Sequence, residues 1–385
     1  MKFNRIYYEV LGVRAEIAKY APEGKTREGH VMLHVQANGE TFFGRLERLI
    51  EAETALMEDS SLAGMSVIYK RYFCSDAANQ AELIPKSDSC ATGIVQQPPL
   101  DGSKIAVWIY MQDAGEVELE QKDGIAGKTL VVRNNGYEHL WNMGMITAEG
   151  NSYEQTSALL EAYEANLDSH NLNIADNCIR TWFFVRDVDI QYSGMVSARK
   201  ENFLQHGLTK DTHYISSTGI CGVPPLTGGI IMLEAYALKN FQANQQSYLY
   251  APTHLNPTIE YGVTFERGTR LDFGDRKHIY ISGTASIDNK GEVVHIGDIK
   301  RQTLRMWENV EKLLEEGGAC FGDVAQIIVY IRDIADYKIV SDMFRERFPD
   351  TPFVITAAPV CRPTWLIEME CIAISHNDNT EYRDF

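Results

Sequence analysis

The fold of this chain is decided by the stretch Phe353-Val-Ile-Thr-Ala-Ala-Pro-Val-Cys361-Arg362-Pro-Thr-Trp-Leu-Ile-Glu368-Met-Glu370-Cys-Ile-Ala-Ile374. Two apolar runs flank a kink at Cys361-Arg362-Pro363, and this pattern predicts two strands. Glu368 and Glu370 share one face of the second strand, because side chains alternate along a strand. Burying a carboxylate in so apolar a strand is costly unless the protein needs it. We therefore interpret this strand as the catalytic edge of the molecule.

The pattern of this stretch occurs three times in the chain. A turn segment with nearby prolines precedes an apolar strand at 105–111, at 230–238 and at 366–374. Upstream, each copy has an expected helix, a β-rich strand and a second helix. The first helices are expected at 42–57, 153–167 and 302–316, the strands at 65–73, 178–185 and 325–331, and the second helices at 77–84, 195–207 and 336–348.

The third copy gives the most detailed expectation. Its first helix carries an apolar stripe at helical spacing, made of Leu304, Trp307, Val310 and Leu314. A hairpin is expected ahead of this helix, with strands at 278–287 and 292–295 joined by a turn at 288–291. Each unit then has the order ββαβαββ.

This order predicts an α+β fold of three tandem units, 1–126, 127–250 and 251–385, each with helices on one face of a sheet. The uncovered sheet faces must be buried, and three of them can pack around a shared axis. We therefore expect an intramolecular pseudo-trimer. The alternative is three domains on a string, but neither junction is rich in proline and serine as a linker would be.

Composition excludes several classes of partner. The chain has 385 residues and a formal net charge of −17, and a nucleic-acid-binding protein would need a basic patch. No apolar run has the length of a membrane span, and the first residues lack the apolar core of a signal peptide. We therefore expect a cytoplasmic protein with no nucleic acid or membrane as partner.

The motifs for metals and cofactors are also lacking. The seven cysteines form no C-x-x-C pair, and the ten histidines form no H-x-x-x-H pair, so we expect no metal site. The sequence has no glycine-rich phosphate loop, and Gly317-Gly318 is better interpreted as a helix C-cap. We expect no cofactor.

The third unit resembles the YjgF/RidA family. The resemblance rests on Ile279-Tyr-Ile-Ser-Gly-Thr-Ala-Ser, on the helix Gln302-Thr-Leu-Arg-Met-Trp-Glu-Asn-Val-Glu and on Ile-Glu368-Met-Glu370-Cys-Ile-Ala. That family forms homotrimers of subunits with a chorismate mutase-like fold and small-molecule clefts between them. The resemblance implies RidA-like units, and their repetition implies a trimer fused into one polypeptide.

The second and third units together resemble the chorismatases, which are chorismate-hydrolysing relatives of RidA. The matching stretches include Ile179-Arg180-Thr-Trp, Ser216-Ser-Thr-Gly-Ile, Tyr261-Gly-Val-Thr-Phe-Glu-Arg267 and Cys361-Arg-Pro-Thr-Trp-Leu-Ile-Glu368. The first unit resembles only its repeat partners. RidA enzymes have an arginine two residues after a proline, but Cys361 follows Pro359 at that spacing and Arg362 comes one step later. A one-residue step on a strand reverses the face, so this difference favours the chorismatase pattern.

By this resemblance Glu368 is the catalytic glutamate and general acid, because an apolar surround would raise its pKa. The alternative for Glu368 is a salt-bridged or edge-exposed strand glutamate. Glu370 is its rival, but Glu234 occupies the equivalent place in the second unit, which favours a structural role for Glu370.

A dicarboxylate substrate calls for at least two cations, and arginine fits carboxylates best. Arg180 is our first candidate and Arg199 the second, with a solvated surface position as the alternative for each. Arg362 could bind substrate or pair with an acid behind the sheet. The remaining candidates for binding or lining the cleft are Tyr192, Gly219 and Cys361, which has no histidine in its motif to activate it as a nucleophile.

Three functions follow as hypotheses. The first is a cofactor-independent, chorismatase-like hydrolase that acts on chorismate or a related cyclic carboxylate and releases pyruvate. The second is a RidA-like enamine/imine deaminase. The third is a non-catalytic small-molecule-binding member of the same superfamily. In each case we expect a carboxylate ligand and a monomer that is itself the pseudo-trimer, with further self-association left open.

Overall fold

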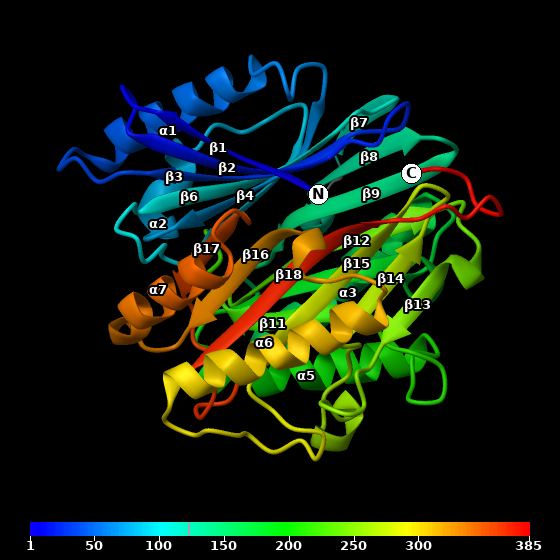
Figure 1. Ribbon diagram of the computed structural model, residues 1–385. Helices are drawn as coiled ribbons and strands as arrows, with labels where there is room; N and C mark the ends of the chain where they lie inside the picture. Colours follow the sequence, from blue (N-terminus) through cyan, green and yellow to red (C-terminus); the bar gives the residue numbers. More distant parts are fainter. Residues whose placement is uncertain (122–123) are drawn as a thin grey trace.

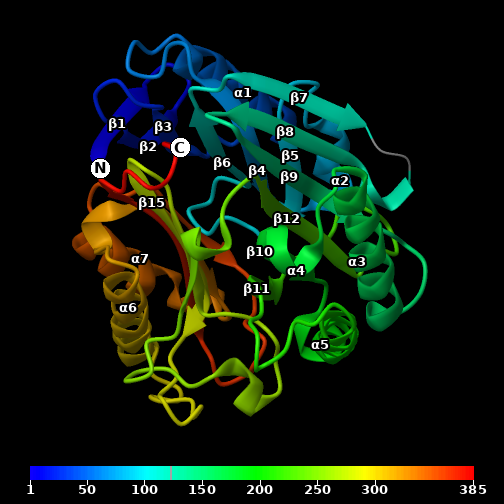
Figure 2. The same ribbon diagram turned by 90° about the vertical axis from the view of Figure 1, so that its right-hand side faces the viewer.

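The computed structural model describes residues 1–121 and 124–385 and contains three six-stranded sheets. The sheets lie inside, and the main helices cover their outer sides, with α1 above, α6 and α7 on the left and α3 and α5 on the right in Figure 2. The chain passes through the sheets one after another, as the colours in Figure 1 show. The expected α+β architecture of three tandem units is therefore confirmed.

The strands have matching orders in the three sheets. The first sheet runs β1-β2-β3-β6-β4-β5, from β1 (Lys2–Tyr8), β2 (Val13–Tyr20), β3 (Glu28–Val35), β4 (Ser66–Cys74), β5 (Ala91–Gln96) and β6 (Ile105–Gln112). The second runs β11-β10-β12-β9-β8-β7, from β7 (Glu116–Gln121), β8 (Lys128–Asn134), β9 (Tyr137–Ile146), β10 (Cys178–Val185), β11 (Ser216–Cys221) and β12 (Ile231–Lys239). The third runs β13-β14-β15-β18-β16-β17, from β13 (Gln246–Leu249), β14 (Gly268–Asp272), β15 (Arg276–Ala285), β16 (Val324–Ile331), β17 (Phe353–Ala357) and β18 (Ile367–His376).

The helices are α1 (Phe42–Met57), α2 (Ala77–Gln80), α3 (Ser152–Ser169), α4 (Ile174–Asn177), α5 (Val188–Gln205), α6 (Ile299–Glu316) and α7 (Tyr337–Arg347). Asp298 caps α6 by accepting a hydrogen bond from the main-chain N–H of Arg301 at 3.0 Å. Trp307, Val310 and Leu314 are buried as expected, but Leu304 is 49% exposed. The buried face of α6 is therefore rotated slightly from the predicted stripe.

Three details differ from the pattern predicted by the sequence. Each unit has an additional leading strand (β1, β7 or β13) at the edge of its sheet. β7 lies before the expected boundary 126/127 but is part of the second sheet, and β13 lies before the expected boundary 250/251 but is part of the third. The second helix of the first unit is the single turn α2, continued by a 3-10 turn at Ala81–Leu83. The predicted hairpin is present only in part: one antiparallel bridge, Ile287–Val293, closes the predicted turn at 288–291, but 292–295 is not a strand and β15 pairs with β14.

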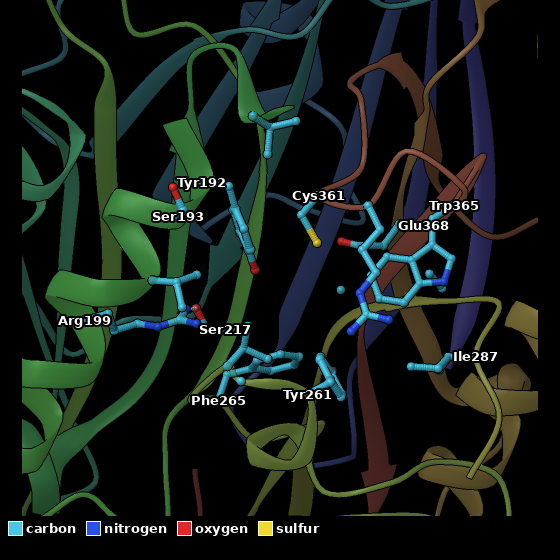
Figure 3. A pocket seen from close by; sticks show the side chains of 18 of the residues that line it. Tyr192, Ser193, Arg199, Ser217, Tyr261, Phe265, Ile287, Cys361, Trp365 and Glu368 are labelled. Atoms are coloured by element: carbon cyan, nitrogen blue, oxygen red, sulfur yellow. Dashed lines mark hydrogen bonds between the residues drawn. The ribbon is translucent and has the colours of Figure 1, made fainter. Parts of the chain in front are cut away.

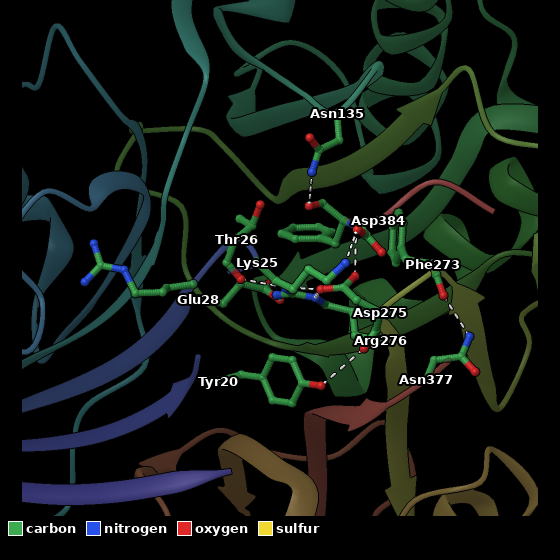
Figure 4. Close-up of polar contacts among 12 residues, drawn as sticks. Tyr20, Lys25, Thr26, Glu28, Asn135, Phe273, Asp275, Arg276, Asn377 and Asp384 are labelled. Carbon is green, nitrogen blue, oxygen red and sulfur yellow. Dashed lines mark hydrogen bonds and ion pairs between the residues drawn. The ribbon is translucent and has the colours of Figure 1, made fainter. Parts of the chain in front are cut away.

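Backbone and ionic contacts close the units around a common centre. One isolated backbone bridge links each pair of units, at Gln96–Val223, Pro99–Thr356 and Ser216–Glu266. Arg276 of the third unit is completely buried and forms ion pairs with Glu28 of the first unit and with Asp275 (Figure 4). Arg276 and His278 lower the pKa of Glu28 despite its burial. The pseudo-trimer is therefore tied by charge as well as by packing.

Candidate active site

A cavity of about 390 Å³ lies between the second and third units. Side chains of α5 form one wall, and the segment 361–368 forms the opposite wall (Figure 3). The segment 261–267 and the end of β15 complete it. The kinked stretch 353–374 therefore faces a cleft built by two units.

Glu368 is the second residue of β18. Its side chain lines this cavity and is only 5% exposed. Its carboxyl group occupies space left free by Gly283, because a Cβ atom at that glycine would lie 2.2 Å from Oε1 of Glu368. The neighbouring Trp365 is fixed by its indole N–H, which donates to the carbonyl oxygen of Ser286 at 3.0 Å. The side chain of Glu368 is thus buried at the cavity wall and closely packed.

Burial and, to a smaller extent, the neighbouring Glu370 raise the pKa of Glu368 to about 8, although Arg267 and Arg180 oppose the increase. At neutral pH the carboxyl group is mainly protonated. A protonated acid held against a cavity can donate a proton to a bound molecule. This geometry fits the role predicted for Glu368.

The acid is a feature of the third unit. The pairing of β4 with β6, of β10 with β12 and of β16 with β18 has one register shift each, which falls between Val67 and Tyr69, between Cys178 and Arg180 and between Val324 and Gln326. Aligning the units there places Glu368 at the position of Met232 in the second unit and Ala106 in the first. The first and second units therefore have an apolar residue at the strand position of this acid.

Three arginines line the cavity, and none has a carboxylate within salt-bridge distance among residues 1–121 and 124–385. Arg199 is 1% exposed; its Nη1 donates to Oγ of Ser217 at 3.3 Å, and its Nε and Nη2 have no partner. Arg267 is 4% exposed and donates to the main-chain and side-chain oxygens of Asn256 at 3.1 and 3.2 Å. Its Nε has no partner. Buried donors without acceptors are costly, so they indicate an anion as ligand.

Arg362 is the third cation. Its guanidinium lies over the rings of Tyr261 and Trp365, at 4.7 Å from each centroid, and Nη1 donates to the carbonyl oxygen of Gly291 at 3.4 Å. Two positions were considered for Arg362, and the structure places its side chain at the cavity. Pairing with an acid behind the sheet is not observed in the part of the chain that the structure describes.

Arg180, the preferred anchor from the sequence, does not line the cavity. Its Nη2 forms a 2.9 Å ion pair with Oε2 of Glu370, and Nη1 donates to Oγ of Ser282 at 3.3 Å. The prediction that Arg180 binds substrate directly does not fit this placement. Side chains two residues apart share a face of a strand, and on that face Arg180 and Trp182 both donate to Glu370.

Tyr192, Gly219 and Cys361 all line the cavity, as expected. Gly219 makes room for an aromatic wall, because a Cβ atom there would lie 3.0 Å from the ring of Tyr192. Burial and the neighbouring Glu368 raise the pKa of Cys361 to about 12. Cys361 is therefore a neutral thiol, which fits a lining role and not that of a nucleophile.

Several lining residues were missed from the sequence. Arg267 ends the stretch that carries the chorismatase resemblance, so the signal was present but the residue was not selected. Ser217 lies beside the predicted Gly219 and binds Arg199. Asp189 is at the rim and forms a bidentate pair with Arg332 at 2.7 and 2.9 Å, which joins the second unit to the third.

Comparisons with known proteins agree with this architecture. The family described as Endoribonuclease L-PSP matches residues 273–375. A RutC family protein of Pyrococcus abyssi is 40% identical over 98 residues, which are 25% of this chain and 76% of the relative. The 3-aminoacrylate deaminase RutC of Acinetobacter baylyi is 31% identical over 98 residues, with 25% and 77% covered.

The chain therefore belongs to the YjgF/RidA superfamily. Over nearly its whole length it has the fold of a chorismatase, whose crystal structure aligns with 92% of this chain and 98% of its own at a TM-score of 0.64 and 18% identity. That likeness establishes the shared three-unit fold. Among the described residues, no helix is long and apolar enough to cross a membrane.

Proposed function

We propose that this protein is a chorismatase-like hydrolase that acts on chorismate or a related cyclic carboxylate, with Glu368 as general acid. One observation carries the proposal: a buried carboxyl group that keeps its proton at neutral pH shares a cavity with three arginines that have no carboxylate partner among the residues the structure describes. Such a cavity can bind a dianion and protonate it. The chorismatase fold supports the same choice of reaction.

The reaction needs a proton on carbon. Glu368 would donate its proton to the methylene carbon of the enolpyruvyl group, leaving an oxocarbenium ion at the neighbouring carbon. Water would add to that carbon and return a proton to the Glu368 carboxylate. In the resulting hemiketal, the bond between the former enolpyruvyl carbon and the ether oxygen on the ring would then break. That oxygen takes up the remaining hydroxyl proton, and pyruvate and a ring alcohol are released.

The arginines would hold the two carboxylates during this sequence. Arg199 and Arg267 offer buried N–H groups without acceptors, and Arg362 offers a guanidinium held between two aromatic rings. Bidentate contacts to planar carboxylates would satisfy those groups. Their positive field would also increase the acidity of Glu368 and so help proton donation.

The test is pyruvate release from chorismate, measured with lactate dehydrogenase and NADH. We expect turnover by the parent chain and a loss of at least about a hundredfold in Glu368→Gln, as is usual on removing a general acid. Glu346→Gln, an exposed glutamate on α7, is the matched control. Unchanged turnover in Glu368→Gln would refute the role, and no turnover by the parent of any enolpyruvyl carboxylate would refute the function.

The second candidate is a deaminase of the RidA type. It is favoured by the 31% identity to a 3-aminoacrylate deaminase and by the position of Arg362 in the cavity. Accelerated ammonia release from an aminoacrylate, lost in Arg362→Ala, would support it over the hydrolase. Thermal stabilisation by small carboxylates without any turnover would instead indicate the non-catalytic binding protein.

A further inference from the structure

Glu370 lies behind the acid, at the junction of all three units, and is 1% exposed. Its Oε2 accepts hydrogen bonds from Nη2 of Arg180 at 2.9 Å and from the hydroxyl of Thr218. Its Oε1 accepts from the indole N–H of Trp182 at 2.8 Å. Three donors, one of them a guanidinium, therefore hold the carboxylate of Glu370 in place.

The first unit also reaches this carboxylate. Nη1 of Arg71 lies 3.7 Å from Oε1 of Glu370, while its Nε and Nη2 donate to Glu234 at 2.9 and 2.5 Å. The guanidinium is completely buried and lies over the ring of Trp182 at 4.8 Å. The same arginine therefore connects one glutamate of the second unit with one of the third.

Glu234 and Glu370 are equivalent by repeat. The register shift that aligns the units places both at the same strand position, with Trp108 in the first unit. Both are buried, and both interact with Arg71. Their strands differ at the position two residues earlier: this residue is the acid Glu368 before Glu370, but Met232 before Glu234.

We propose that Glu370 is a positioning residue, held by Arg180 of the second unit and Arg71 of the first, that acts electrostatically on Glu368 from two residues away on the same face of β18. The proposal rests on the proposed role of Glu368 and adds the residue that sets its proton affinity. It also gives the first unit a part in the site, through Arg71. Arg180 and Arg71, which hold Glu370, are not among the residues that line the cavity, so a substrate can enter without displacing them.

The direction of the effect follows from the surrounding charges. The ionisable groups that face Glu368 are Glu370, Arg180, Arg267, Cys361, Tyr192, Tyr261 and Tyr330. Glu370 is the other carboxylate among them, and burial raises the pKa of the thiol and of the phenols. Replacing it with a neutral side chain removes the like charge and leaves Arg180 without its partner. Both changes favour the ionised form of Glu368.

The test is the pH at which Glu368 loses its proton, measured in the folded protein by the infrared band of its protonated carboxyl group. The band is assigned by its absence in Glu368→Gln in each background. We expect the midpoint in Glu370→Gln to fall by about one pH unit or more. Glu234→Gln is the matched control, and its midpoint should move much less, although both variants lose a buried ion pair.

An unchanged midpoint in folded Glu370→Gln, or an equal change in Glu234→Gln, would overturn the proposal. If Glu370→Gln does not fold, the double variant Arg180→Gln with Glu370→Gln removes a neutral pair. Its midpoint should still fall, because Glu370 affects Glu368 more than Arg180 does. The midpoint is read without turnover, so absence of chorismate hydrolysis would refute the proposed function while leaving this result interpretable.

Discussion

Replacing Glu368 with glutamine should change the pH dependence of folding stability in a specific way. The pKa of Glu368 is raised from 4.5 to about 8 in the folded chain. Below about pH 4.5 both the folded and unfolded states hold the proton, so stability does not depend on this group. Between pH 4.5 and 8 the unfolded chain releases the proton and the folded chain keeps it. The parent is therefore destabilised progressively as pH rises, and Glu368→Gln is not.

The size of this effect follows from the pKa shift. One pKa unit corresponds to about 1.36 kcal/mol, so the contribution reaches roughly 3 kcal/mol at pH 7 and roughly 5 kcal/mol above pH 8. Glutamine has nearly the same shape as the protonated acid, so the packing around Gly283 should be kept. The free energy of unfolding of Glu368→Gln relative to the parent should thus rise with pH by that amount.

Urea denaturation of the parent, Glu368→Gln and the control Glu346→Gln between pH 4.5 and 8.5 would measure this. Other groups titrate in the same range, but they are common to all three proteins and cancel in the difference. If the stability curves of Glu368→Gln and the parent run parallel over this range, the carboxyl group is ordinary and the reasoning about the acid fails. The control should run parallel to the parent.

Three more outcomes are expected at the cavity. Arg199→Met should weaken binding of cyclic dicarboxylates by about tenfold or more, seen as a smaller rise in melting temperature with added ligand. Gly283→Ala should reduce turnover while the chain stays folded by circular dichroism, because the new Cβ atom would lie 2.2 Å from Oε1 of Glu368; full turnover would contradict the packing described. Iodoacetamide at pH 8 should label the exposed Cys320 well before Cys361, whose pKa of about 12 leaves little thiolate; mass spectrometry that finds the reverse order would contradict the environment assigned to Cys361.

The candidate site shows where sequence reasoning succeeded and where it stopped. Glu368, Cys361 and Gly219 belong to stretches with a recognisable pattern, and all three line one cavity. Arg180 belongs to such a stretch as well, but its buried partner Glu370 is 190 positions away in the chain. Local alternation indicates that Arg180 shares a face with Trp182, but it does not show that a carboxylate from another unit lies against that face.

The sequence by itself determined the repeat and the α+β class, because strand alternation and helical spacing are properties of neighbouring residues. It also placed a carboxylate, Glu368, within an apolar run, and the resemblance to the chorismatases gave that carboxylate its predicted role. The tertiary structure decided which two units form the cavity, which arginines line it and how far the pKa of Glu368 is raised. Each of these depends on burial and on charges from other units that come together only when the three sheets close around their common centre.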